Sequence, residues 1–143
     1  EFIKTSWWEY LPMKALDSTF IIDFLRNDKG AIDKEIELRS EFLATSAVNY
    51  FEVLLGIFLM KENQERKQKI FDEFMSHLEI FPLGVNESKK VAEFAATLIK
   101  TGKTIEELDY LIAWILLSHW CTTIVTKNKD HFKRIEGIQV EGY

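Results

Sequence analysis

The sequence contains very little cysteine, proline or glycine. Only one of its 143 residues, Cys121, is a cysteine, so no disulfide can form within the chain, and a reducing, cytoplasmic location is expected. The two prolines and six glycines exclude a collagen-like chain and argue against disorder. Cys121 directly follows a tryptophan, and we expect it to be a small, buried hydrophobic residue.

Long apolar runs are also missing. The longest, such as YLIAWILL at 110–117, fall far short of the roughly 20 residues of a membrane-spanning helix, so no membrane association is expected. No basic segment followed by an apolar stretch opens the sequence, so no signal peptide is predicted. Residues 1–12 fit neither helical nor strand periodicity and precede Met13. They are interpreted as an N-terminal extension or a cloning remnant, and residues 13–143 as one domain.

Basic residues are outnumbered by acidic ones. The chain has 18 Lys and Arg against 23 Asp and Glu, which gives a net charge of −5. A protein that binds nucleic acid through its overall charge is normally basic. Any contact with nucleic acid must therefore come from a local basic patch, or through metal ions that offset the carboxylates.

Short apolar runs alternate with amphipathic segments along the chain. The expected strands are 14–16, 42–48, 78–83, 122–126 and 137–143, and the expected helices are 20–26, 31–39, 50–63, 64–77, 88–100 and 104–117. This alternation predicts an α/β domain with a mostly parallel sheet of about five short strands and helices on both faces. Ser18 or Thr19 is the expected N-cap of the first helix, and Asn49 that of the third.

The segment TIEELDYLIAWILL at 104–117 places three carboxylates before an almost wholly apolar run. Thr104 and Glu107 fit a capping box, in which each side chain accepts a hydrogen bond from the other residue's backbone N–H. Glu106 lies in the same first turn, where the helix dipole favours negative charge. Asp109 lies beyond the N–H groups that a carboxylate could serve. It therefore needs a partner, because burying an unpaired charge is very costly.

Other oxygen-bearing side chains follow the expected strands. Asp17 comes directly after the first strand, Glu52 lies just inside the helix after the second, and Asn128 and Asp130 follow the fourth. The ligand crevice of an open parallel sheet lies at the carboxyl ends of its strands, so these residues and Asp109 are expected to meet there. A cluster of carboxylates with little nitrogen or sulfur around it predicts a Mg²⁺ or Mn²⁺ site.

Each of these side chains, taken alone, also has an ordinary explanation. Asp17 could be a turn residue, Glu52 a first-turn capping acid, and Asp130 a loop acid. Other catalytic patterns fail: Gly102-Lys103-Thr104 lacks the first glycine of a phosphate-binding loop, because position 97 is threonine. The three histidines show no metal-ligand spacing among themselves.

Four segments carry a family resemblance: LDSTFIIDFLR, LATSAVNYFEVLLG, IEELDYLIAWILLSHW and IVTKNKDHFKRIEGIQV. In this order and spacing they resemble the PIN-domain nucleases, and most closely the VapC-type toxins of prokaryotic toxin–antitoxin pairs. The resemblance covers residues 13–143. It implies a small metal-dependent endoribonuclease that is held silent by a cognate antitoxin and usually forms a homodimer.

The resemblance also assigns roles to residues. Asp17, Glu52 and Asp109 correspond to the family's metal-binding acids, with Mg²⁺ or Mn²⁺ as the ion. The fourth position, often aspartate in the family, is Asn128 here, and Asp130 is close enough to substitute for it.

Basic and aromatic residues near these acids are the expected contacts of RNA and of the partner. The basic side chains that could hold the RNA backbone, or form a solubilising loop, are Lys127, Lys129, Lys133 and Arg134. The expected antitoxin contacts are Tyr50, Phe51 and Phe58. Two alternatives stay open: a PIN-fold module that binds RNA or a partner without cleaving, and a DNA flap-type nuclease, which the lack of a duplex-binding arm disfavours.

Overall fold

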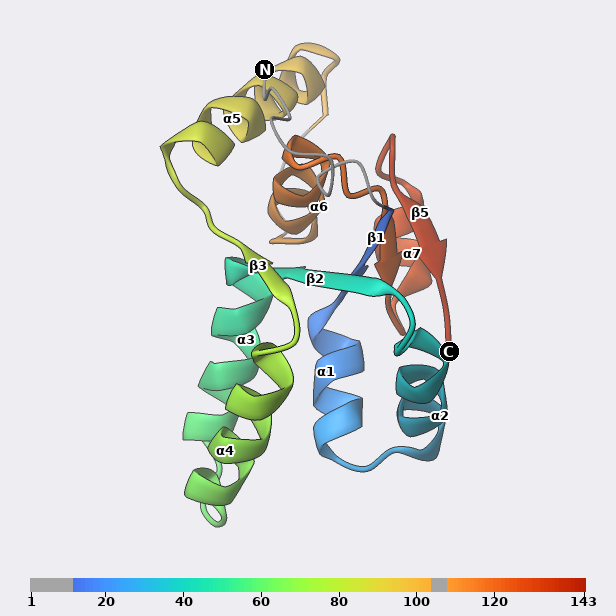
Figure 1. Cartoon of the computed structure of the whole chain (residues 1–143). Coiled ribbons are helices and arrows are strands. Elements are labelled where there is room, and N and C mark those ends of the chain that lie inside the picture. Colours follow the sequence, from blue (N-terminus) through green and yellow to red (C-terminus); the bar gives the residue numbers. More distant parts are fainter. Residues whose placement is uncertain (1–11, 104–107) are drawn as a thin grey trace.

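A computed structural model of the chain describes residues 12–103 and 108–143. Its elements are β1 (Met13–Leu16), α1 (Ser18–Leu25), α2 (Lys29–Leu38), β2 (Phe42–Ser46), α3 (Ala47–Phe58), α4 (Gln64–Met75), β3 (Glu79–Phe81), α5 (Val85–Lys100), α6 (Leu108–Ser118), β4 (Thr123–Val125), α7 (Lys129–Lys133) and β5 (Gln139–Glu141). The strands form one sheet in the order β3-β2-β1-β4-β5, and every neighbouring pair is parallel (Figure 1). The predicted α/β fold with a parallel sheet is confirmed.

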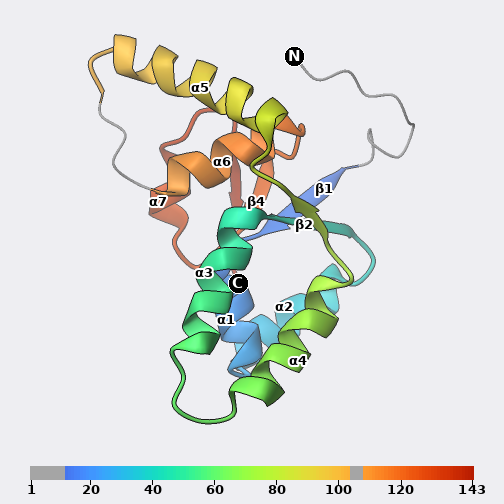
Figure 2. The same ribbon diagram turned by 90° about the vertical axis from the view of Figure 1, so that its left-hand side faces the viewer.

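The alternation of side chains along the strands divides the core into two layers. Ala15 of β1 and Ile124 of β4 pack with α6 and α7, and the partly buried Val91 of α5 joins them. The next residues, Leu16 and Val125, face the opposite side and pack with α1, α2, α3 and α4. Figure 2 shows α5 lying across α6 on one side of the sheet, and α3 and α4 extending together away from it on the other. Helices on both faces were predicted and are confirmed.

Two of the expected helix caps are wrong. The strand predicted for 42–48 ends at Ser46, and Ser46 rather than Asn49 is the N-cap of α3: its Oγ accepts a hydrogen bond from the Asn49 backbone N–H at 3.1 Å. Serine is a strongly preferred N-cap residue, and its position at the last residue of β2 lets the helix begin at Ala47, three residues earlier than predicted. The N-cap of α1 is Asp17 rather than Ser18 or Thr19. The expected capping box of Thr104 and Glu107 lies outside the described residues.

Other boundaries also differ from the sequence prediction. Asp28 caps α2, accepting a hydrogen bond from the Ala31 N–H at 3.0 Å, so this helix begins two residues earlier than predicted. Helix α5 begins at Val85 rather than at residue 88. Helix α7 was not predicted, because five residues are too few to display a helical period.

An ion-pair network ties the edge strand β5 to its neighbours. The Lys34 Nζ lies 2.7 Å from Glu141 Oε2, and the Lys14 Nζ lies 2.9 Å from Glu141 Oε1. Lys34 is buried, with a relative exposure of 8%. Burial alone would raise the pKa of Glu141, but the hydrogen bonds from Lys34 and Lys14 outweigh it and leave that pKa lowered. The last strand is thereby anchored to α2 and β1.

Two further expectations concern the burial of Cys121 and the presence of a membrane-spanning helix. Cys121 is 1% exposed, as predicted, and burial raises the pKa of its thiol to about 12. Across residues 12–103 and 108–143, no helix combines the length and the apolar character that a bilayer crossing requires.

Candidate functional site

The site lies at the carboxyl ends of β1 and β4. These strands are neighbours at the centre of the sheet, while β2 and β3 extend from the other side of β1. The direction of the connections therefore reverses between β1 and β4, which is where ligands bind in open parallel sheets. Asp17 follows β1 and Thr126 follows β4, and the Asp17 N–H donates to the Val125 carbonyl at 3.0 Å.

Asp17 is buried and held by neutral donors. Its exposure is 4%, and its side chain caps none of the N–H groups of α1. Its Oδ2 accepts hydrogen bonds from Thr126 Oγ1 at 2.8 Å and from Thr19 Oγ1 at 3.0 Å, and its Oδ1 accepts one from Asn49 Nδ2 at 3.2 Å. These contacts fix the carboxylate without neutralising its charge.

Glu52 lies on α3, three residues after Asn49, the residue that donates to Asp17. Its Oε1 accepts a hydrogen bond from Ser18 Oγ at 2.7 Å. Burial raises the pKa of Glu52, the Ser18 hydrogen bond opposes the rise, and the negative charges of Asp17 and Asp109 add to it. The charges of Asp17, directly after β1, and of Asp109, on α6, therefore both act on Glu52.

Asp109 lies on α6 and has a histidine partner. Its Oδ2 is 3.0 Å from the Nδ1 of His131 on α7. The sequence indicated that Asp109 needs a partner, but it did not identify His131. A histidine that pairs with a carboxylate on another element leaves no spacing pattern among the histidines themselves.

The backbone of Asn128 is linked to Asp17 through the Thr126 hydroxyl. Its backbone N–H donates to Thr126 Oγ1 at 3.0 Å, and the same hydroxyl donates to Asp17. Within the described part of the chain, no hydrogen bond connects Asp130 to the three acids. Both residues are exposed and line a shallow cavity of about 410 Å³, together with Lys127, Lys129, His131 and Lys133.

The donor chemistry of the site suits a hard divalent cation. Carboxylate and amide oxygens are the ligands that Mg²⁺ and Mn²⁺ prefer. Among the described residues, no lysine or arginine forms an ion pair with Asp17 or Glu52. The same residues contain no group of three or more His, Cys, Asp or Glu side chains close enough to hold an ion.

The four predicted RNA-binding residues lie on or beside α7 and are exposed. The Lys127 N–H donates to Thr19 Oγ1 at 3.1 Å, which places this residue directly beside the acids. Its Nζ lies 3.3 Å from Asp23 Oδ2. The Arg134 guanidinium lies 4.8 Å from the ring centre of Tyr110, a cation–π contact.

The predicted antitoxin contacts differ in exposure. Phe51 and Phe58 are 59% and 51% exposed. Tyr50 is half-buried and packs on Phe71 with ring centres 4.9 Å apart, so it contributes to the core. With two exposed leucines, the phenylalanines form an apolar stripe along α3, made of Phe51, Leu55, Phe58 and Leu59.

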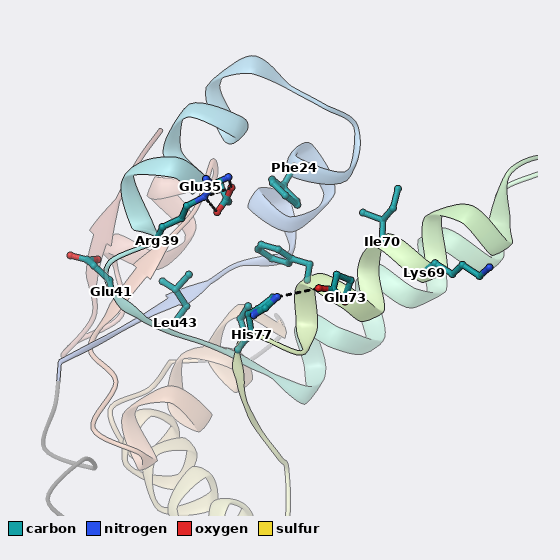
Figure 3. Close-up of a pocket in the computed structure, with 11 residues that line it drawn as sticks. Phe24, Glu35, Arg39, Glu41, Leu43, Lys69, Ile70, Glu73 and His77 are labelled. Atoms are coloured by element: carbon teal, nitrogen blue, oxygen red, sulfur yellow. Dashed lines mark hydrogen bonds and ion pairs between the residues drawn. The ribbon is translucent and has the colours of Figure 1, made fainter.

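A groove between α2 and α4 offers a second apolar surface. Its cavity volume is about 650 Å³. Its lining residues, most of them labelled in Figure 3, are Phe24, Glu35, Arg39, Glu41, Leu43, Lys69, Ile70, Glu73, Phe74, His77 and Leu78. Two polar contacts lie in its lining: an ion pair of Arg39 Nη2 with Glu35 Oε1 at 2.9 Å, and a hydrogen bond between His77 Nε2 and Glu73 Oε1 at 3.3 Å.

Comparison with known proteins points to one family. The PIN domain model matches residues 14–138. The tRNA(fMet)-specific endonuclease VapC of Salmonella typhimurium is 24% identical over 128 residues, which cover 90% of this chain and 96% of that protein. Ribonuclease VapC1 of Rickettsia felis is 34% identical over 91 residues, covering 62% of this chain and 67% of that protein.

A solved structure has the same fold. The crystal structure of VapBC2 from Rickettsia felis, bound to a DNA fragment from its promoter, contains a chain that superimposes with a TM-score of 0.76. The sequence identity is 24%, and the match covers 92% of this chain and 98% of that one.

Proposed function

Because the chain belongs to the PIN-domain family, we propose that it is a metal-dependent endoribonuclease of the VapC type, the toxin of a toxin–antitoxin pair. The observation that carries this proposal is that Asp17 and Glu52 share one hydrogen-bond network through Ser18 and Asn49, while the charge of Asp109 acts on Glu52 from α6. Burial raises the pKa of Glu52, and the charges of the other two acids raise it further. These three carboxylates would hold Mg²⁺ or Mn²⁺.

Each residue of the site has a part in the proposed reaction. When bound, a divalent ion polarises the scissile phosphate and lowers the pKa of an attacking water. The carboxylates of Asp17, Glu52 and Asp109 supply oxygen ligands rather than transfer protons. Asn128, joined to Asp17 through the Thr126 hydroxyl, is the fourth member and positions water with its side-chain amide. Asp130 remains the alternative for that role.

The lysines near α7 supply the contact with RNA. A protein of net charge −5 needs a local patch to hold a polyanion. Lys127, Lys129 and Lys133 line the cavity that also contains Asn128, so a phosphate backbone lying there reaches the acids. Arg134, stacked on Tyr110, extends the patch along α7.

The cognate antitoxin is the proposed partner, and the chain is also expected to form a homodimer. An antitoxin segment with apolar side chains fits the α3 stripe, where Phe51 and Phe58 are exposed. It also fits the groove between α2 and α4, where Ile70 is 38% exposed and Phe24 stacks on Phe74 with ring centres 4.6 Å apart. The charged side chains of Arg39 and Glu35 at that groove would lie at the polar rim of such an interface.

The test is RNA cleavage by the purified protein in Mg²⁺, in Mn²⁺ and in chelator. Wild type should cleave single-stranded RNA only with metal, and Asp17→Asn, Glu52→Gln and Asp109→Asn should each abolish cleavage. Glu62→Gln, which removes an exposed acid in the loop before α4, is the matched control and should cleave normally. Cleavage that persists in chelator, or in all three site variants, would overturn the proposal. RNA binding without any cleavage by wild type would instead indicate a non-cleaving PIN module.

A further inference from the structure

Asn49 is the most connected buried polar residue at the acidic site. It is 1% exposed and lies on α3, one turn before Glu52. Its Nδ2 donates two hydrogen bonds, to Asp17 Oδ1 at 3.2 Å and to Ser18 Oγ at 2.9 Å. Its Oδ1 accepts one from Ser46 Oγ at 2.7 Å. Both donor hydrogens of the amide and its acceptor are therefore used.

The orientation of this amide is determined by its neighbours. Ser46 offers Oδ1 two donors, its hydroxyl at 2.7 Å and its backbone N–H at 3.4 Å. If the amide were flipped, the NH₂ group would face the Ser46 N–H, and the oxygen would face the Asp17 carboxylate. Both contacts would be repulsive, so the capping serine at the end of β2 fixes the direction in which Asn49 donates.

The hydrogen bonds continue from Asn49 to Glu52. A serine hydroxyl carries one hydrogen. The Ser18 hydroxyl donates it to Glu52 Oε1 at 2.7 Å and accepts from Asn49 Nδ2. One amide thus holds Asp17 directly and Glu52 through Ser18.

From this arrangement we propose that Asn49 is a positioning residue, which sets the relative orientation of the Asp17 and Glu52 carboxylates for binding a divalent ion. The inference depends on the proposed metal-dependent function. It adds that ion affinity depends on a neutral residue that would not itself contact the ion. Replacing hydrogen-bond partners that orient metal ligands typically costs about 10–100-fold in metal affinity or activity.

Mn²⁺ binding to the full chain tests the inference without requiring activity. Free Mn²⁺ is titrated by its electron paramagnetic resonance signal in wild type, Asn49→Leu and Ser18→Ala. Asn49→Leu approximately keeps the shape but removes both donors, and Ser18→Ala breaks only the link to Glu52. Both should weaken Mn²⁺ binding by about 10-fold or more. At saturating Mn²⁺ both should lower kcat for RNA cleavage while leaving KM for RNA nearly unchanged.

A buried serine at the other end of α6 provides the matched control. The Ser118 hydroxyl donates to the Ile115 carbonyl at 2.6 Å, remote in sequence from Asp109. Ser118→Ala should lower the melting temperature, as any lost buried hydrogen bond does, without changing Mn²⁺ affinity. A purely structural role for Asn49 would give this same pattern in Asn49→Leu and would overturn the inference.

The remaining outcomes are also decisive. If Asn49→Leu does not fold, Ser18→Ala decides: weakened Mn²⁺ binding supports the inference, and wild-type affinity overturns it. Asp17→Asn and Glu52→Gln serve as references. If these two bind Mn²⁺ as wild type does, the proposed metal site itself is wrong. If they lose binding while both positioning variants keep it, only the role of Asn49 is wrong.

Discussion

Glu52→Gln should make the metal-free protein more stable while removing its response to metal. Glutamine keeps a carbonyl oxygen that can accept the Ser18 hydroxyl, which donates to Glu52 Oε1 at 2.7 Å. It removes the charge that burial and the neighbouring Asp17 and Asp109 disfavour. The substitution therefore relieves repulsion at little cost in hydrogen bonding.

The size and the pH dependence of this effect follow from the raised pKa of Glu52. Relief of an unfavourable charge commonly contributes about 0.5–2 kcal/mol to the free energy of unfolding, and solvent screening of a half-exposed group favours the lower half of that range. Above the raised pKa, folded wild type carries the full penalty of an ionised Glu52. As pH falls toward the ordinary carboxyl range, the folded state takes up a proton before the unfolded state does, and the penalty disappears. The variant should thus gain most at neutral and alkaline pH.

Thermal melts in chelator and in Mn²⁺ measure both effects. An ion at 100 times its dissociation constant stabilises the folded state by about 2.7 kcal/mol. For a chain of this length, about 4 °C per kcal/mol makes this a rise of about 10 °C in the melting temperature of wild type. Glu52→Gln should melt a few degrees higher than wild type in chelator at pH 7.5 and respond far less to Mn²⁺. A variant that melts lower in chelator at every pH and responds to Mn²⁺ as wild type does would refute the reasoning.

Three further predictions have separate readouts. Asn128→Ala should shift the Mn²⁺ dependence of cleavage while Asp130→Ala leaves it nearly unchanged, and the reverse result would give Asp130 the fourth position. Glu141→Gln should lower the free energy of unfolding by about 1–3 kcal/mol at pH 7, because it leaves the buried Lys34 with only its longer contact to Glu37, at 3.4 Å. Since the pKa of Glu141 is lowered, this contribution is full at neutral pH and is lost as acid titrates the carboxylate, so urea melts of the two proteins should converge at low pH. Ile70→Asp, in the groove, should weaken antitoxin binding without changing RNA cleavage, and unchanged antitoxin affinity would remove the groove from the interface.

The fold could be predicted from the sequence because short apolar runs alternate with amphipathic segments along most of the chain. The prediction failed at an element boundary that a contact between residues determines, and at a helix that is too short to show a period. The apolar run 42–48 gives no internal reason to end at Ser46, and the strand stops there because the serine caps α3. Five residues cannot show a helical period, so α7 was missed.

The acids were easier to find from the sequence than the residues that hold them. Asp17 and Glu52 follow strands, and Asp109 was singled out because it was expected beyond the first turn of its helix. In the structure α6 begins at Leu108, so that Asp109 lies in its first turn. Ser18 and Asn49 were interpreted as helix caps, a local role that is common for these residue types. Their actual partners come from other elements: Ser18 donates to a residue 34 positions away, and Asn49 to one 32 positions away. Such pairings depend on how the elements pack, and no spacing in the sequence encodes them.

The choice of partners for Asp17 and Glu52 itself argues for a cation site. A lysine or arginine beside a carboxylate would offset its negative charge, and the protein does this elsewhere, at Lys34 and Glu141. At the acidic site the chain instead uses hydroxyl and amide donors from Ser18, Asn49 and Thr126. Neutral donors satisfy the oxygen lone pairs but leave the negative charge in place. A site built for stability alone would have cancelled that charge, whereas a site that attracts a divalent ion has to keep it.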